Sequence, residues 1–142
     1  MIKLIAPKHG FMELENNWRY KSLQNLEKIR CDDMANAPTR LVQRCQELRK
    51  IPLIEYTVED LRLMIGQDFG LFYLVPLAIV KLQDNLLAEG DMYEGDLLAS
   101  VLKINNVFWK ENTDLWWQVN QLISDKRDII ASLNISTEKF DT

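Results

Sequence analysis

The stretch from Gly66 to Leu82, GQDFGLFYLVPLAIVKL, constrains the fold more than any other part of the chain. No charged side chain occurs between Leu71 and Val80, and the apolar residues occupy every side of a helical wheel. A helix with this pattern belongs in the middle of a fold, because no side of it is suited to water. It is too short to cross a membrane, since a span needs roughly 20 apolar residues. The pattern therefore predicts a buried central helix with other helices packed around it.

Pro76 interrupts this stretch and limits where the central helix can begin. Proline lacks an N–H, and its ring clashes with the carbonyl group four residues earlier, so it is tolerated best in the first turn of a helix. We therefore expect a short turn at 71–73 and then a main helix over about 75–86, with a single kinked helix as the alternative. Gly66 suits the left-handed residue that commonly ends a helix, so the preceding helix should end there.

Other helices are predicted on both sides of the central one, because capping residues precede runs with helical apolar spacing. Thr57 and Asp60, for example, are spaced as in a capping box, with Asp in place of the usual Glu or Gln. The expected N-caps are Ser22, Thr39, Thr57, Asp96, Thr113 and Ser124, with Asn105 or Asn106 before a further turn at 107–109. No convincing strand is found. The sequence thus predicts an all-α fold, a compact single-domain bundle of about seven short helices around the buried central helix.

The chain divides into three parts by composition. Residues 1–21 contain Pro7 and Gly10 and show no clear period, so we expect an irregular N-terminal arm packed on the domain. Residues 22–134 carry the predicted helices, and residues 135–142 form a polar C-terminal tail that should fray. With 142 residues, the chain can bury a sizeable core without metals or disulfides.

The net charge of -4 argues mildly against binding to nucleic acid, because the phosphate backbone requires a basic surface. An acidic balance suits a basic protein partner, although it is more often only a device for solubility. Neither a secretory signal nor a membrane-spanning segment is recognisable, so the cytoplasm is the expected location and no membrane contact is expected.

A search for catalytic chemistry finds no candidate. The single histidine, His9, lies in the irregular arm, and the two cysteines, Cys31 and Cys45, match neither a disulfide framework nor a zinc pattern. Cys45 lies on the apolar side of a predicted helix, which is typical of a small core residue. No phosphate-binding glycine loop and no nucleophile elbow are recognisable. We therefore predict no catalytic residue, no cofactor and no metal, and a binding protein rather than an enzyme.

The segment Glu89–Asp96, EGDMYEGD, is the strongest loop signal, with two glycines and four acidic residues. An EF-hand would need an oxygen ligand at its fifth position and Glu at its twelfth, where this chain has Tyr93 and Ser100. The simplest interpretation is a turn shaped by Gly90 and Gly95, with the last acid as a helix cap. Binding of a protein partner is the second interpretation, and a small metal-dependent enzyme is a third, weaker one.

Trp116 and Trp117 are adjacent, so on a helix they point about 100° apart and can hardly both face one core. Trp116 continues an apolar stripe with Val119. Trp117 is expected to cover a second surface, such as the N-terminal arm, with an exposed interface anchor as the alternative.

Several motifs occur in an order that resembles a known bacterial family. They are Thr57-Val58-Glu59-Asp60-Leu61-Arg62, Ile65-Gly66-Gln67, Leu74-Val75-Pro76-Leu77-Ala78, Tyr93-x-Gly95-Asp96-Leu97-Leu98 and the later Phe108-Trp109. Over about residues 22–117 the chain resembles the immunity proteins of contact-dependent growth inhibition (CDI). The resemblance implies a cytoplasmic antidote that binds and blocks a toxin domain delivered by a neighbouring cell, often a nuclease, without catalysis and without a cofactor.

Motifs shared by such a family are expected to maintain the fold rather than to recognise one toxin, which would make Arg62, Gly66, Pro76 and Gly95 structural. The cognate toxin domain, expected to be a basic nuclease, should instead contact exposed residues, with Tyr93 as an anchor. The candidates are Glu89, Asp91, Tyr93 and Glu94 in the loop, and Asp32, Asp33, Glu111 and Asp114 elsewhere. A helical adaptor or regulatory protein with an endogenous partner is the alternative function.

Overall fold

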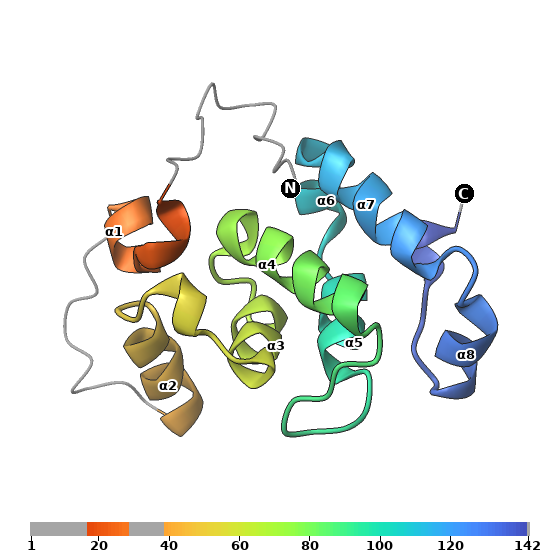
Figure 1. The fold of residues 1–142 in the computed structure, drawn as a ribbon, viewed down its shortest axis with the longest axis horizontal. Helices are drawn as coiled ribbons and strands as arrows, with labels where there is room; N and C mark the ends of the chain where they lie inside the picture. Colours follow the sequence, from red (N-terminus) through yellow and green to blue (C-terminus); the bar gives the residue numbers. More distant parts are fainter. Residues whose placement is uncertain (1–16, 29–38, 142) are drawn as a thin grey trace.

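The computed structural model describes residues 17–28 and 39–141, which form helices joined by short loops (Figure 1). No strand occurs within these ranges, so the predicted all-α fold is confirmed. Eight α-helices and three 3-10 turns make up this part of the chain. In chain order they are η1 (Trp18–Tyr20), α1 (Leu23–Glu27), α2 (Arg40–Leu48), η3 (Leu53–Glu55), α3 (Val58–Gly66), α4 (Leu71–Asp84), α5 (Asp96–Leu102), α6 (Asn106–Glu111), α7 (Thr113–Ile123), α8 (Arg127–Ser132) and η4 (Glu138–Phe140).

The helix α4 is the buried central helix that the sequence predicts. In Figure 1 it runs through the middle of the molecule, with α3 and α5 on one side and α7 on the other, and it contacts all three. Four consecutive residues, from Tyr73 to Pro76, are buried. Because consecutive residues point in different directions around a helix, their burial requires neighbours on every side of α4.

The central helix begins earlier than predicted, and the expected division near Pro76 is wrong. A single helix, which was the alternative prediction, runs from Leu71 to Asp84, and Pro76 lies inside it. A proline at this position removes one helical hydrogen bond, the bond to the carbonyl of Phe72. Burial of α4 side chains such as Val75 and Ile79 among the surrounding helices offsets this loss, since each buried apolar side chain contributes roughly 1.5–3 kcal/mol.

The connection between α3 and α4 is tight and uses two left-handed residues. Gly66, expected to take the left-handed conformation, is instead the last helical residue of α3. That conformation is taken by Asp68 and Gly70, both with φ of 61°. A Cβ atom at Gly70 would lie 2.6 Å from Leu23 Cδ1, so the close approach of α1 requires glycine there as well as the φ angle.

Most of the predicted helix starts are confirmed by side-chain hydrogen bonds. The Thr57 hydroxyl accepts from the Asp60 N–H and the Asp60 carboxylate accepts from the Thr57 N–H, so the capping box is present. Thr113 and Ser124 are not N-caps, because Thr113 is already the first residue of α7 and Ser124 follows the last one. The confirmed N-caps are Ser22, Thr39, Thr57 and Asn105.

The C-terminal residues 135–141 pack against the helices, so the prediction that they fray is wrong. The Phe140 side chain is buried, and its ring stacks on Trp116 with 5.4 Å between the ring centroids. The Trp116 indole N–H donates to the carbonyl of Lys139 at 3.1 Å, and Arg127 donates to the carbonyl of Phe140 at 2.9 Å. Two buried side chains, those of Ile135 and Phe140, thus hold a segment whose other residues are polar.

The predicted N-terminal arm lies mostly outside the described residues, which begin at residue 17. Within the described part of the arm, Trp18 is buried and its ring lies 6.2 Å from the Tyr73 ring of α4. Trp117, expected to be covered by this arm, has 57% of its surface exposed. Whether residues 1–16 cover it stays a prediction.

The helix α2 packs through a narrower face than its sequence suggests. Cys45 is buried, as expected of a small core residue, whereas Leu41 on the predicted apolar stripe is 41% exposed. His9 and Cys31 lie outside the described residues. In the described ranges no helix combines the length and the apolar character needed to cross a membrane.

Candidate interaction surface

The acidic loop, residues 89–95, joins α4 to α5 and presents its side chains to solvent. In Figure 1 it projects at the lower edge of the molecule. Three carboxylates and two apolar side chains share this short segment, a combination that suits a partner with basic and apolar contacts. The exposed side chains are those of Glu89, Asp91, Met92 (65% exposed), Tyr93 (45% exposed) and Glu94.

The Asp96 carboxylate holds the backbone of the acidic loop in place. Its oxygens accept hydrogen bonds from the N–H groups of Gly90 (2.7 Å), Met92 (3.0 Å) and Tyr93 (3.3 Å). Only 2% of Asp96 is exposed. The prediction that Asp96 is the N-cap of α5 is therefore wrong: its carboxylate binds the loop, and Gly95 occupies the N-cap position. An acid in the first turn still suits the positive end of the helix dipole.

Glu59 and Arg62 on α3 complete this support. Glu59 Oε1 accepts from the Asp91 N–H at 2.8 Å. Arg62 binds both oxygens of Glu59, with 2.6 Å from Nε to Oε1 and 2.5 Å from Nη2 to Oε2. Arg62 Nε also lies 3.8 Å from Asp96 Oδ2, so one guanidinium serves both carboxylates. We call Glu59, Arg62 and Asp96 the support network.

The support network stabilises the charged form of Glu59. Hydrogen bonding from Arg62 lowers the pKa of Glu59, and the Asp91 N–H adds to this shift, although partial burial opposes it. The same hydrogen bonds to Glu59 raise the pKa of Arg62. Glu59 therefore stays ionised at neutral pH and keeps its full strength as an acceptor for the loop.

Gly90 is required because the support network approaches its backbone closely. A Cβ atom there would lie 2.6 Å from Glu59 Oε1, 3.1 Å from Asp96 Oδ2 and 3.2 Å from the Glu59 Cα atom. Gly95 has a φ angle of 85°, in the left-handed region that favours glycine. The prediction that both glycines shape the loop is thus correct, but Gly90 does so through close contact with α3.

The other predicted contact residues do not join the acidic loop. Glu111 is exposed at the end of α6, and Asp114 is half-buried in the first turn of α7. Figure 1 shows α6 and the start of α7 at the opposite edge of the molecule from the loop. Asp32 and Asp33 lie outside the described residues. Within residues 17–28 and 39–141, no group of three His, Cys, Asp or Glu side chains is placed to hold a metal ion.

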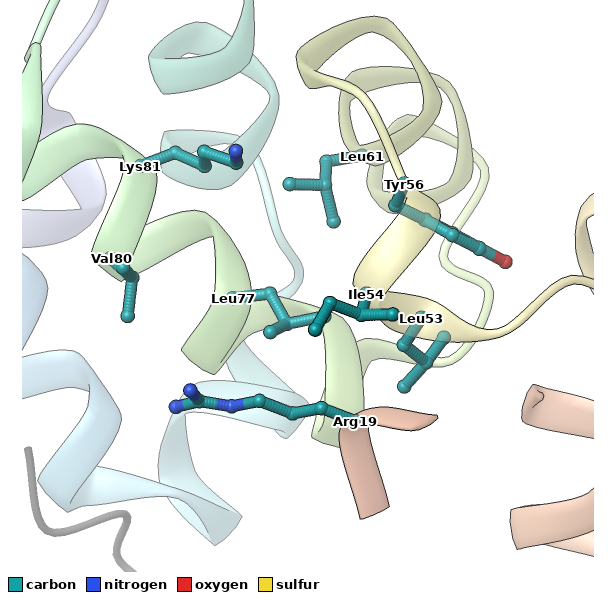
Figure 2. Close-up of a pocket in the computed structure, with 8 residues that line it drawn as sticks. All are labelled: Arg19, Leu53, Ile54, Tyr56, Leu61, Leu77, Val80 and Lys81. Carbon is teal, nitrogen blue, oxygen red and sulfur yellow. The ribbon is translucent and has the colours of Figure 1, made fainter. Parts of the chain in front are cut away.

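A second candidate surface is a pocket of about 150 Å³ beside η3 and α4, shown in Figure 2. Two charged side chains line it, Arg19 and Lys81, and we call it the cation-lined pocket. Sequence reasoning missed it, because it is assembled from η1, η3, α3 and α4 and no local pattern brings these elements together. Its other lining residues are Leu53, Ile54, Tyr56, Leu61, Leu77 and Val80.

Comparison with known proteins links the chain to one family. A family model described as CDI immunity proteins matches residues 25–119, which is 95 of the 142 residues. The matched range contains the whole acidic loop and the support network, whereas Arg19 precedes it. No curated protein and no solved structure matches the chain.

Proposed function

The chain belongs to the family of CDI immunity proteins, and we propose that it binds and neutralises the toxin domain of its own growth-inhibition system. The mechanism is stoichiometric binding, in which the protein covers a surface that the toxin needs, and no catalysis is required. Such an antidote acts in the cytoplasm, where a delivered toxin would meet its substrate. Membership of the family favours this function over a helical adaptor with an endogenous partner.

We further propose that the toxin is a nuclease with a basic surface. A protein that binds nucleic acid carries Lys and Arg for the phosphate backbone. The net charge of -4 and the exposed carboxylates of the acidic loop complement such a surface. Complementary charge speeds association and disfavours wrong partners, and fast capture is what an antidote needs.

The acidic loop is the proposed toxin contact, and the support network is the observation that favours it most. The network binds the N–H groups of residues 90–93 inside the protein and leaves the side chains of Met92 and Tyr93 exposed. A loop that is ordered before binding loses less conformational entropy when a partner docks. The two exposed apolar side chains would anchor the contact, and the carboxylates beside them would supply the charge.

Charge reversal in the loop tests this proposal. Changing Glu89, Asp91 and Glu94 together to Lys should weaken toxin binding roughly tenfold or more, because attraction becomes repulsion. Tm should stay nearly unchanged, since exposed substitutions rarely shift stability by more than about 0.5 kcal/mol each. Affinity is measured by calorimetry against the toxin domain encoded beside this gene, and toxin activity is assayed with and without the immunity protein.

A matched variant controls for overall charge. Asp125, Asp128 and Glu138 are exposed around α8, and their reversal changes the net charge by the same amount. This control should keep most of the wild-type affinity. Unchanged affinity of the loop variant would show that the loop is not part of the interface. Equal losses of affinity in both variants would show that only the net charge of the protein matters, and not the position of the loop.

A further inference from the structure

Arg19 differs from the other half-buried arginines in the described part of the chain. Each of those others pairs with a carboxylate: Arg49 with Glu27, Arg62 with Glu59, and Arg127 with Asp141. No described carboxylate pairs with Arg19, whose guanidinium carbon lies 5.5 Å from the centre of the Trp18 ring. Its Nε is buried and has no hydrogen-bond acceptor among the described residues. Partly buried charges are normally paired, and the Arg19 guanidinium also lines a pocket, so we look for its acceptor in a ligand of that pocket.

Lys81 supplies a second positive charge at the same pocket. It is exposed on α4, and no carboxylate of the described residues pairs with it. In Figure 2 the Lys81 amine and the Arg19 guanidinium lie on opposite sides of Leu77 and Ile54. On a protein of net charge -4, two cations around one pocket form a local basic site that would attract a carboxylate.

The space between the two cations is apolar and close to the size of one side chain. The pocket has a volume of about 150 Å³, and Leu53 and Leu61 in its lining are buried. Ile54 beside them is 52% exposed, so the pocket opens to solvent. An apolar group placed there would remove further apolar surface of Ile54 from water, which contributes about 25 cal/mol for each Å².

We propose that the cation-lined pocket is a second binding site, which takes an apolar side chain of a partner polypeptide together with the Asp or Glu carboxylates that flank it in that partner. The apolar side chain would lie against Leu77 and Ile54, and one flanking carboxylate would accept hydrogen bonds from Arg19 and the other from Lys81. A free small acid would bury too little surface in so open a pocket to bind well, which favours a polypeptide segment. The site is independent of the acidic loop, whose charge has the opposite sign.

The test uses a short peptide and the full-length chain. An acetylated, amidated Asp-Leu-Glu tripeptide is titrated into the ¹⁵N-labelled protein, and backbone amide shifts are followed by NMR. The shifts should saturate and should centre on residue 19 and on residues 53–56 and 77–81. A neutral Asn-Leu-Gln tripeptide should bind about fivefold more weakly, because it lacks the charge-assisted hydrogen bonds. Equal binding of the two peptides would overturn the proposal.

Substitutions of the two cations test whether they bind the carboxylates of the acidic peptide. Arg19→Met and Lys81→Met keep an apolar stem, remove the charge, and should each weaken the acidic peptide about fivefold. Arg40→Met makes the same change at an exposed arginine of α2 and should leave binding unchanged. An equal loss with Arg40→Met would overturn the proposal, as would 4-methylpentanoate binding as tightly as the peptide. None of these outcomes bears on the toxin proposal, since no toxin is present.

Discussion

The acidic loop and the cation-lined pocket both include residues of the helix α3, but they differ in whether their charged side chains have partners within the protein. Glu59 and Arg62 of this helix hold the loop, and Leu61 between them lines the pocket. At the loop, one guanidinium serves two carboxylates, and these accept four backbone N–H groups. At the pocket, two cations face an apolar lining, and no described carboxylate pairs with them.

The difference separates two uses of a charged side chain. A charged side chain that is hydrogen-bonded inside the fold orders the backbone around it. Moving one of the backbone N–H groups away would leave a buried polar group unpaired, which is costly where the dielectric is low. A charge that is left without a partner contributes little to folding and remains available to a ligand. Substitutions in the two regions should therefore change stability by very different amounts.

Asp96→Ala should have the largest effect on stability. It removes the acceptor of three backbone N–H groups and the second counter-charge of Arg62. We expect the free energy of unfolding to fall by about 2–4 kcal/mol. Urea denaturation measures it, with Asp125→Ala at an exposed site as the control that should change stability by less than about 0.5 kcal/mol. Similar losses of unfolding free energy in both variants would show that Asp96 does not hold the loop in place.

The same substitution at two arginines compares the regions directly. Arg62→Met leaves Glu59 without its cation, and we expect a loss of about 1–3 kcal/mol, less than for a fully buried pair. Arg19→Met removes only the contact of the guanidinium with the Trp18 ring and keeps the apolar stem, so stability should change by less than about 1 kcal/mol. Both are measured by urea denaturation, and equal losses would contradict the distinction between the two regions.

The smallest expected effect is the pH dependence that Glu59 contributes. Because its pKa is lower in the folded chain, unfolding takes up a proton in acid solution. Its contribution is complete above the ordinary Glu pKa of about 4.3 and is lost as the pH falls through the lower folded value. The stability difference between wild type and Glu59→Gln should thus shrink below about pH 4. A difference that is constant from pH 7 to pH 3 would refute this.

Local features of the fold could be predicted from the sequence, because caps and apolar spacing act over a few residues. The Thr57–Asp60 capping box and the buried stretch around Pro76 are examples. The helix through Pro76 was predicted only as the alternative, because its stability depends on packing against helices distant in the chain. The packed C-terminal segment was missed for the same reason, because Phe140 is held by Trp116 from another helix.

The candidate site shows the same limit. The exposed acids of the loop could be predicted from composition, but Asp96 was assigned to the wrong backbone groups, because its partners depend on how the loop folds back. The link from Glu59 to Asp91 spans 32 residues and has no local signature. Arg19, in a segment without any period, gave no signal at all. Polar contacts between residues distant in the chain are thus the features of the site that a single sequence does not predict.

The acidic loop is held by main-chain atoms, and this frees its side chains to change. The hydrogen bonds that fix it come from Asp96 and Glu59 to N–H groups, which every residue except proline possesses. No side chain at positions 89, 91, 92 or 94 accepts or donates in these bonds. The residues at those four positions can therefore be substituted while the loop keeps its backbone conformation. The protein can change the chemistry of this surface without changing its fold.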